Sequence, residues 1–403
     1  MKIVQINSTC GVGSTGRIAV GISEVLSGRG IENYIIHTGS TNGYSQGIPV
    51  ADGAYIRSQA IRSRILGNYG LNSKEATKRI IAKTEKIAPD IVHIHNIHSH
   101  DCDLEELFSY FKRHNTRLIW TFHDCWAFTG YCPHYFMAGC QKWQTECGKC
   151  VQRRDHSLLF DRSRLLFCKK KALLSGLDMT VVTPSRWLAG EVKKSFLKDY
   201  PVEVIYNGID LDIFKPTSSS FRQKYGLEGK KLVLGVAFGW GRRKGLDVFV
   251  ELSKRLPEDY RIVLVGTDGN CDRKLPKSIL SIHRTESASQ LAEIYTAADV
   301  FVNPTREDTL SMTNIEALAC GTPAVTFKAG GAPECVTEDC GCCVEIDDIT
   351  SLENEIIRIC TERPYTHSAC TGRGAAFDKN ARFKEYLELY ERIVTSRDKR
   401  DRN

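Results

Sequence analysis

Long apolar runs are missing from this sequence. Hydrophobic residues make up 42% of the 403 residues, yet they form no stretch near the roughly 20 residues that a membrane-spanning helix needs. The apolar start, MKIVQIN, is too short for a signal peptide, and no small-residue cleavage pattern follows it. We therefore expect a cytoplasmic protein.

A strong charge of either sign is missing too. The formal net charge of +7 permits an anionic substrate or membrane surface without demanding one. Because aromatic and basic residues are not interleaved, we expect no nucleic-acid partner. Arg and Lys gather among apolar residues in segments 57–68 and 152–171. This pattern is typical of a helix on a membrane surface and also of an ordinary solvated helix face.

Internal repeats and low-complexity tracts are missing as well, so the length predicts two domains of ordinary composition. Short apolar, β-branched runs predict strands at 2–6, 33–37, 91–95, 117–122, 179–183, 202–206, 231–237, 261–266, 300–303 and 322–327. Amphipathic segments predict helices at 16–29, 75–87, 103–114, 245–254, 287–298 and 351–360.

Strands and helices therefore alternate, which indicates an α/β fold with parallel sheets covered by helices on both faces. The alternation occurs twice, with a turn-rich break near 206–220. We predict two doubly wound, Rossmann-like domains that face each other across a cleft. The first covers residues 1–200, with a cysteine-rich loop at 125–150, and the second covers 201–375. Residues 376–403 are expected to form a helix that returns to the first domain, followed by a charged tail.

A glycine-rich turn follows the first predicted strand. Gly11, Gly13 and Gly16 have the spacing G-x-G-x-x-G and open a helix, whose N-terminal N–H groups can bind phosphate. The alternative is a tight turn without a ligand. The acidic residue that holds a ribose about 20 positions later is missing, which disfavours a nicotinamide-dependent dehydrogenase.

A second phosphate-binding candidate lies in the segment 234–252. Arg242, Arg243 and Lys244 stand in a glycine-broken loop just before Gly245 and a predicted helix. Three cations beside a helix N-terminus can clamp a pyrophosphate. A solvated basic turn is the other interpretation.

Three acids stand close together in the segment 305–323. Glu307 and Asp308 precede a short apolar helix, and Glu316 lies within it. The Thr313–Glu316 spacing is that of a capping box, which closes a helix N-terminus by reciprocal hydrogen bonds. The alternative is a site that binds the hydroxyl groups of a sugar nucleotide.

Cysteine is abundant, and in a cytosolic chain the sixteen cysteines are thiols or metal ligands rather than a disulfide framework. Cys132, Cys140, Cys147 and Cys150 lie within one loop, and the last two form CGKC. This group predicts a structural zinc site, with free thiols and redox chemistry as alternatives. The tightly spaced cysteines in ECVTEDCGCC, residues 334–343, are interpreted as part of a loop.

Together these segments resemble the retaining glycosyltransferases of family 4, which have the GT-B fold. The resemblance covers essentially the whole chain. Its markers are the glycine turn, TFHD (121–124), TPSRWLAG (183–190), NGIDLDIF (207–214), Lys244–Gly245, AADVFVNPT (297–305) and EALACGTPAV (316–325). The cysteine-rich loop and the RED form of the acidic motif resemble a subgroup that acts in colanic-acid, capsule and O-antigen synthesis.

The resemblance implies roles for individual residues. Asp308 and Glu316 match the family's two acids: Asp308 would contact the transferred sugar and Glu316 the nucleotide ribose. Asp308 is one methylene shorter than the usual glutamate, and Glu307 could take its place. Further binding residues implied for the donor lie in the two loops: Gly13, Ser14, Gly16, Thr309, Leu310 and Ser311.

The resemblance also implies catalytic roles for His123, which would contact the donor sugar, and for Lys244, which would neutralise the diphosphate. The family's clamp arginine falls on Gly239 here, so we hypothesise that Arg242 or Arg243 supplies the missing charge. Retention is expected on the front face, with the leaving diphosphate taking the acceptor's proton. The protein then acts by positioning and charge stabilisation, and no metal is needed for catalysis.

The function that the resemblance implies is transfer of a sugar from a UDP- or GDP-sugar to a lipid-linked saccharide in bacterial surface polysaccharide synthesis. We expect the enzyme in the cytoplasm, in peripheral contact with the inner membrane face. Two alternatives are a sugar-nucleotide epimerase of the same fold and a zinc-containing nucleic-acid-binding protein.

Overall fold

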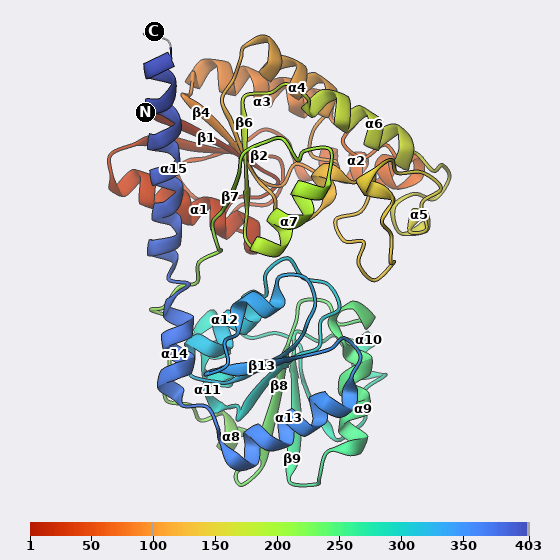
Figure 1. The fold of residues 1–403 in the computed structure, drawn as a ribbon, viewed down its shortest axis with the longest axis vertical. Coiled ribbons are helices and arrows are strands. Elements are labelled where there is room, and N and C mark those ends of the chain that lie inside the picture. The colour runs from red at the N-terminus through yellow and green to blue at the C-terminus, as the bar shows by residue number, and fades with distance from the viewer. Residues whose placement is uncertain (99, 401–403) are drawn as a thin grey trace. The chain divides into compact units, whose positions relative to one another are not determined.

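The computed structural model describes residues 1–98 and 100–400, and its contacts divide the chain into two compact units (Figure 1). Unit 1 comprises residues 1–206 and the chain from Asn380 onward, and unit 2 comprises residues 207–379. The sequence analysis places these borders at 200 and 375. The final helix extends to Arg400, so the first part of the charged tail is helical, and residues 401–403 lie outside the described part.

Unit 1 contains, within the described residues, a parallel sheet of seven strands in the order β3-β2-β1-β4-β5-β6-β7. The strands are β1 (Lys2–Asn7), β2 (Glu32–His37), β3 (Gly47–Pro49), β4 (Ile91–Ile94), β5 (Leu118–Thr121), β6 (Met179–Thr183) and β7 (Val202–Val204). The helices are α1 (Gly13–Gly28), α2 (Gly53–Leu66), α3 (Lys74–Ile87), α4 (Leu104–Arg113), α5 (Arg153–His156), α6 (Ser163–Leu174), α7 (Arg186–Lys194) and α15 (Lys379–Arg400), with 3₁₀ turns η1 (Trp126–Phe128) and η2 (Lys142–Gln144).

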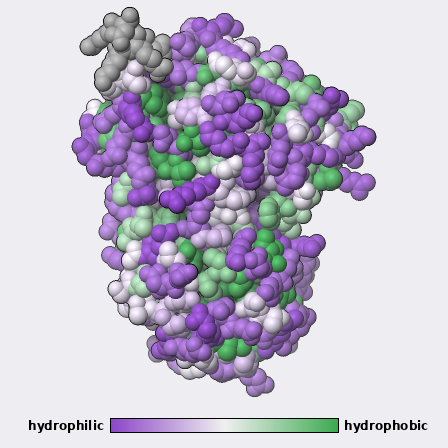
Figure 2. Space-filling model, viewed as in Figure 1, coloured by the Kyte–Doolittle hydropathy of each residue, from purple (hydrophilic) through white to green (hydrophobic). Residues whose placement is uncertain are grey.

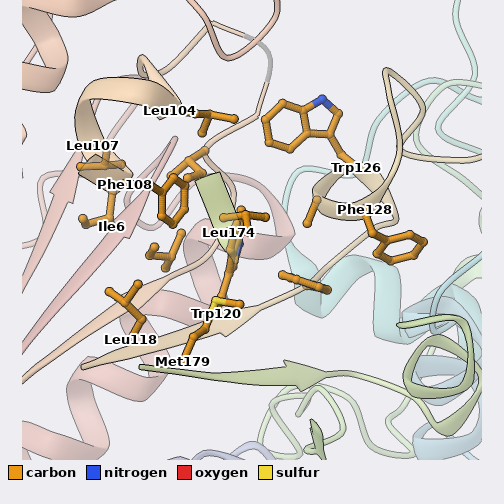
Figure 3. Close-up of a cluster of buried hydrophobic side chains, with 14 of the residues drawn as sticks. Ile6, Leu104, Leu107, Phe108, Leu118, Trp120, Trp126, Phe128, Leu174 and Met179 are labelled. Carbon is orange, nitrogen blue, oxygen red and sulfur yellow. The ribbon is translucent and has the colours of Figure 1, made fainter. Parts of the chain in front are cut away.

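Helices cover both faces of this sheet. Successive side chains of a strand point to opposite faces, so each central strand contributes to the hydrophobic clusters on both sides. Ile3 packs into one hydrophobic cluster and Val4 into another, and Ile91 and Val92 divide in the same way. The strands therefore appear in the sequence as continuous apolar runs rather than as alternating patterns. Figure 3 shows the larger cluster, in which Phe108 of α4 stacks on Trp120 of β5 with ring centroids 5.4 Å apart.

The other face of the sheet is covered by α1 and by the C-terminal helix α15 (Figure 1). Phe383, Tyr386 and Tyr390 of α15 are buried in this second cluster. The two helices approach closely: a Cβ added at Gly21 of α1 would lie 2.2 Å from the Phe383 ring. The end of the chain thus completes the core of unit 1.

Unit 2 contains, in the part that is described, a parallel sheet of six strands in the order β10-β9-β8-β11-β12-β13. The strands are β8 (Lys231–Val236), β9 (Tyr260–Val265), β10 (Ile279–Ile282), β11 (Val300–Asn303), β12 (Ala324–Phe327) and β13 (Gly341–Val344). The helices are α8 (Phe221–Lys224), α9 (Leu246–Arg255), α10 (Gly269–Asp272), α11 (Ala288–Ala297), α12 (Met312–Ala319), α13 (Ile349–Glu362) and α14 (His367–Ala375), with 3₁₀ turns η3 (Arg242–Lys244) and η4 (Ala332–Cys335).

The two parallel sheets confirm the predicted α/β fold class with doubly wound domains. The sequence analysis missed β3, β10 and β13, which are short strands at the sheet edges. The interpretation of residues 334–343 as loop is wrong for its last residues, because Gly341, Cys342 and Cys343 pair with β12. Edge strands are paired on one side only, so their sequences carry a weaker apolar signal than central strands.

None of the described helices combines the length and the hydropathy that crossing a bilayer requires. Figure 2 shows a face on which hydrophilic residues predominate and hydrophobic residues occur in small groups. All sixteen cysteines lie within the described residues, and none of them forms a disulfide.

The docking of α15 on unit 1 leads to a first prediction. Replacement of Phe383 by Ala removes a side chain that is 5% exposed, and such changes cost about 3–5 kcal/mol of unfolding free energy. Lys384 on the same helix has a side chain that is 54% exposed, so Lys384→Ala should change stability by no more than about 0.5 kcal/mol. Urea denaturation measures the unfolding free energy of both variants and of the unmodified protein. Equal stabilities would show that α15 does not contribute to the core.

Candidate functional site

Each sheet has a point at which the strand order reverses, and ligands of such folds bind beyond the carboxyl ends of the strands there. In unit 1 this point lies between β1 and β4, and in unit 2 it lies between β8 and β11. The glycine turn follows β1, and the Arg242–Lys244 loop follows β8. The predicted phosphate-binding segments therefore occupy equivalent positions in the two units.

The glycine turn needs all three of its glycines for steric reasons. Gly11 has φ of +70°, and an added Cβ would lie 2.2 Å from the Asn42 side chain. Gly13, the first residue of α1, also has φ of +70°, a backbone angle that residues other than glycine rarely adopt. Gly16 is buried, and an added Cβ would lie 2.7 Å from the Thr9 hydroxyl oxygen. Val12 is the N-cap and makes no side-chain cap, and Ser14 is exposed in the first turn. The turn thus has the geometry that a phosphate needs at a helix N-terminus.

His123 lies just beyond the carboxyl end of β5, and its Nε2 is 3.1 Å from Nδ1 of His95, which follows β4. Burial lowers the pKa of His123 to about 4, although the charge of Asp124 acts in the opposite direction. His123 is therefore a neutral ring at physiological pH. It can accept or donate a hydrogen bond, but it cannot neutralise a phosphate as a cation.

Asp124 forms an ion pair with His98, whose Nε2 is 3.1 Å from a carboxylate oxygen. The Trp126 N–H donates to the other oxygen at 2.8 Å. Burial opposes ionisation of Asp124, but His98 and this N–H outweigh it and lower the Asp124 pKa to about 2. The sequence analysis did not single out His98, and only its position after β4 could have indicated this pairing.

Lys244 and Asp308 are brought together in unit 2. The Lys244 ammonium donates to an Asp308 carboxylate oxygen at 2.9 Å, and each side chain is 19% exposed. Lys244 ends η3 after β8, and Asp308 lies in the loop after β11, the neighbouring strand. The residues predicted to bind the diphosphate and the sugar therefore pair with each other in this structure.

Asp308 is held from two sides. The Ser311 hydroxyl donates to its carboxylate at 3.1 Å, and Asn303 donates to Ser311 at 2.6 Å. The Gly331 N–H donates to the Asp308 carbonyl at 3.0 Å, and a Cβ at Gly330 would lie 1.9 Å from that carbonyl. The segment GGAPE, residues 330–334, is not among the donor-binding residues predicted from the sequence, although the close approach requires Gly330.

Arg306 and Glu307, which precede Asp308 in the chain, are both buried. Glu307 is 6% exposed, and the Thr305 hydroxyl donates a hydrogen bond to its backbone carbonyl at 3.0 Å. Arg306 donates two hydrogen bonds to Asp247, at 2.9 and 2.8 Å, and pairs with Asp347 at 2.6 Å. The bidentate arginine ties the loop after β11 to α9, which fixes the backbone that carries Asp308.

Glu316 lies on α12 and accepts a hydrogen bond from the buried Tyr295 hydroxyl at 3.0 Å. The capping-box alternative is wrong, because the N-cap of α12 is Ser311 and it makes no side-chain cap, while Thr313 lies inside the helix. Thr309 and Leu310, predicted as donor-binding residues, are buried in the loop before it.

Arg242 and Arg243 present their side chains to solvent to different extents: Arg242 is exposed and Arg243 is half-buried. Their backbone carbonyls bind Arg306, since the Arg306 N–H donates to Arg243 at 2.9 Å and the guanidinium donates to Arg242. The η3 turn is thereby held in place while its cationic side chains stay accessible.

The four cysteines predicted as zinc ligands pack against one hydrophobic cluster of unit 1. A hydrogen bond from Cys132 lowers the pKa of Cys150 to about 7, and the Gly130 N–H donates to Cys147 sulfur at 3.2 Å. Within the described residues, however, no group of three or more His, Cys, Asp or Glu side chains is placed to hold a metal ion. Zinc binding by Cys132, Cys140, Cys147 and Cys150 stays a prediction that metal analysis of the purified protein tests.

Both units match known protein families. Residues 15–213 match the family described as Glycosyltransferase Family 4, and residues 230–362 match Glycosyl transferases group 1. The chain is 25% identical over 217 residues to D-inositol 3-phosphate glycosyltransferase of Mycobacterium sp. (strain JLS), covering 50% of this chain and 49% of that protein. It is 24% identical over 230 residues to putative colanic acid biosynthesis glycosyl transferase WcaC of Escherichia coli (strain K12), covering 52% and 55%. The chain thus spans about half the length of the curated relatives it matches.

Solved structures match over nearly the whole chain. Sucrose-phosphate synthase from Thermosynechococcus elongatus superposes with a TM-score of 0.74 at 19% identity, covering 98% of this chain and 99% of that one. Anabaena Alr3699/HepE in complex with UDP-glucose superposes with a TM-score of 0.69 at 14% identity, covering 97% and 99%. At these identities the match establishes the GT-B fold.

The pairing of His98 with Asp124 leads to a prediction about pH. Burial alone disfavours the charged ring, but the charge and hydrogen bond of Asp124 raise the His98 pKa above its usual value. The pair should therefore stabilise unit 1 fully below about pH 6.5, and this stabilisation should be lost as the pH rises through the raised pKa. In Asp124→Asn the effect of burial remains, so the His98 pKa should fall below about 6.5 in an NMR titration. An unchanged pKa would refute the pairing.

Proposed function

We propose that this chain is a GT-B glycosyltransferase that transfers a sugar from a nucleotide-sugar donor to a saccharide acceptor. It joins a segment that matches Glycosyltransferase Family 4 to a segment that matches Glycosyl transferases group 1. The observation that carries the proposal is the Lys244–Asp308 pair at the switch point of unit 2, on the same unit as Glu316. A cation and two acids suit the diphosphate, the sugar and the ribose of one donor.

Donor binding exchanges the partner of Lys244. The Lys244 ammonium is neutralised by Asp308 at 2.9 Å. A diphosphate carries more charge than one carboxylate and accepts charge-assisted hydrogen bonds, so it takes Lys244 over and releases the Asp308 carboxylate for sugar hydroxyls. Arg242 or Arg243 on the same turn supplies the second cation. The complex of Anabaena HepE, a protein of the same fold, with UDP-glucose supports a nucleotide sugar as the donor. We propose a UDP- or GDP-sugar.

Glu316 binds the nucleotide ribose in this proposal. A carboxylate accepts several hydrogen bonds at once, so the bond from Tyr295 at 3.0 Å can orient Glu316 while the ribose hydroxyls donate to the same group. The Tyr295 ring is fully buried, so it holds the carboxylate in one place.

Transfer proceeds with retention of the anomeric configuration. On the front face, the leaving diphosphate takes the proton of the acceptor hydroxyl, and Lys244 stabilises the charge that develops on the diphosphate. His123 contacts the donor sugar as a neutral ring, since burial lowers its pKa to about 4. The chain thus acts by positioning and electrostatics, with no covalent intermediate on a protein side chain.

The role of Lys244 yields a prediction. Lys244→Ala should lower kcat by roughly 10²- to 10³-fold, because the cation that stabilises the leaving group is lost. Lys254→Ala is the matched control: it removes the same charge from the same unit at a side chain that is 65% exposed. A coupled assay for released nucleotide, with and without a saccharide acceptor, measures both rates. NMR of the product linkage reports its anomeric configuration.

The nucleotide sugar that serves as the donor can be identified by ligand binding to the purified protein. Only a ligand that binds the folded state raises the melting temperature, so UDP-, GDP- and ADP-sugars are compared by thermal shift. Arg242→Ala or Arg243→Ala should weaken the shift, and two unchanged values would remove the substitute-arginine hypothesis. Equal rates in Lys244→Ala and Lys254→Ala would refute the assignment of Lys244. Sugar conversion without any acceptor would instead indicate an epimerase.

The acceptor class proposed is a lipid-linked saccharide of a bacterial surface polysaccharide, such as a capsule or O-antigen. WcaC of Escherichia coli, a relative named for colanic acid biosynthesis, supports this class. A lipid-linked acceptor requires the enzyme at a membrane, and unit 1 has a surface that suits one.

This lipid-facing patch is built from α2 and the segment 158–160. Ile61 and Ile65 lie one helical turn apart on α2 and are 62% and 37% exposed. The Leu158 and Leu159 N–H groups donate to carbonyls at the end of α2, at 2.9 and 3.2 Å, which brings the two segments side by side. Leu158, Leu159 and Phe160 are about half exposed.

Basic residues surround the lipid-facing patch. Arg57 and Arg62 are exposed on α2, Arg153 donates to the Leu158 carbonyl at 3.2 Å, and Arg162 lies 5.6 Å from the Phe160 ring centre. Apolar side chains with arginines at their rim match the interface of a membrane whose lipids are anionic. We propose that this patch holds the enzyme peripherally at the inner face of the cell membrane.

Vesicle binding tests the patch. Because apolar burial and charge both contribute, binding to vesicles that contain phosphatidylglycerol should exceed binding to phosphatidylcholine vesicles and should weaken with salt. The double variant Leu159→Ser, Phe160→Ser should bind roughly tenfold more weakly. Tyr225→Ser, at a 38% exposed position of unit 2, is the control. Equal binding by all three proteins would exclude this patch as the contact.

A further inference from the structure

A row of polar side chains crosses the buried sheet of unit 1. Gln5 of β1, His95 after β4 and His123 after β5 stand at odd-numbered positions, on the same face of the sheet as Ile3, Ile91 and Ile119 of the cluster under α15. Gln5 and His95 are 0% and 1% exposed. Two contacts link the three side chains: His95 Nε2 to Gln5 Oε1 at 2.9 Å, and His95 Nδ1 to His123 Nε2 at 3.1 Å.

The orientation of the Gln5 amide is determined by the backbone. Its Nε2 lies 3.0 Å from the carbonyl oxygen of Ala19, which can only accept a hydrogen bond. The NH₂ group of Gln5 must therefore face Ala19, and the amide oxygen faces His95. Because an amide oxygen also only accepts, His95 must carry a proton on Nε2.

The proton on His95 decides the proton on His123. Burial lowers the pKa of His95 well below its usual value, so the ring is neutral and has a single N–H. That N–H lies at Nε2, which leaves Nδ1 of His95 as an acceptor. The 3.1 Å contact to His123 is then a hydrogen bond in which His123 Nε2–H donates. His123 is neutral as well, so the lone pair of its ring lies on Nδ1.

We infer that Gln5 and His95 are positioning residues that hold His123 in the tautomer with its proton on Nε2, so that His123 meets the substrate with an acceptor, Nδ1. The substrate group at this nitrogen is a hydrogen-bond donor, such as a sugar hydroxyl, and not a phosphate oxygen. The last statement rests on the proposed function, whereas the tautomer itself does not.

The tautomer is measured directly. In protein labelled with nitrogen-15 histidine, long-range proton–nitrogen correlations distinguish a protonated from an unprotonated ring nitrogen. The His123 signals are assigned by their loss in His123→Gln. The unmodified protein should show Nε2 of His123 protonated and Nδ1 unprotonated. A proton on Nδ1 overturns the inference.

Two substitutions of similar size at His95 test the positioning. His95→Leu removes the acceptor, so the His123 signals should move toward a mixture of tautomers. His95→Gln can accept from His123 and donate to Gln5, so the signals should stay as in the unmodified protein. With a donor sugar and an acceptor, kcat/KM should fall roughly tenfold to a hundredfold in His95→Leu and recover in His95→Gln.

The controls separate this role from general damage to the core. Tyr390→Phe removes the hydroxyl that lies 2.6 Å from His93, a buried hydrogen bond beside the row but outside it, and should leave the His123 tautomer unchanged. Should His95→Leu not fold, Gln5→Met breaks the row at its other end and should give the same shift. Unchanged His123 signals in the folded variant overturn the inference. An intact tautomer response without any transfer activity would refute the proposed function alone.

Discussion

Parallel strands bring their carboxyl ends to one edge of a sheet, and this constraint decides where the polar groups of both units meet. In each sheet the strand order reverses once beside the first strand, and the loops on either side of that point open into the same space. Lys244 and Asp308 are 64 positions apart in the sequence, yet they form an ion pair because β8 and β11 are neighbours. The same arrangement places His95 beside His123 in unit 1.

The second constraint is burial on both faces of each sheet. A polar group on such a strand or in a closely packed loop must find a partner, since an unpaired one costs about 1–3 kcal/mol. Arg306 meets this demand with Asp247 and Asp347, and Asp124 meets it with His98. Each pairing also fixes a loop: Arg306 holds the backbone of Asp308, and Asp124 follows directly on His123. The interactions that satisfy buried charges thus also position the residues to which we assign the chemistry.

The sequence predicted the central strands well, because they are apolar throughout and bounded by turns. Of the ten strands expected, Met179–Thr183 and Val300–Asn303 have the predicted bounds, and the others differ by a few residues. The edge strand β13 was interpreted as loop, since its segment GCCV follows a run of acids and cysteines without apolar periodicity. The capping box was a false local signal: the backbone enters α12 at Ser311, two residues before Thr313.

The amino-acid sequence by itself determined the order of strands and helices, the division into two doubly wound domains and the chemical character of the loops that follow each strand. These properties depend on local propensity and on the period of the apolar residues. Only the tertiary structure decided that Lys244 pairs with Asp308, that Gly330 and Gly331 enclose Asp308, and that Gln5 acts on His123 through His95. Such pairings depend on which strands become neighbours and in what register. Contacts between residues far apart in the chain set both, and local sequence does not encode them.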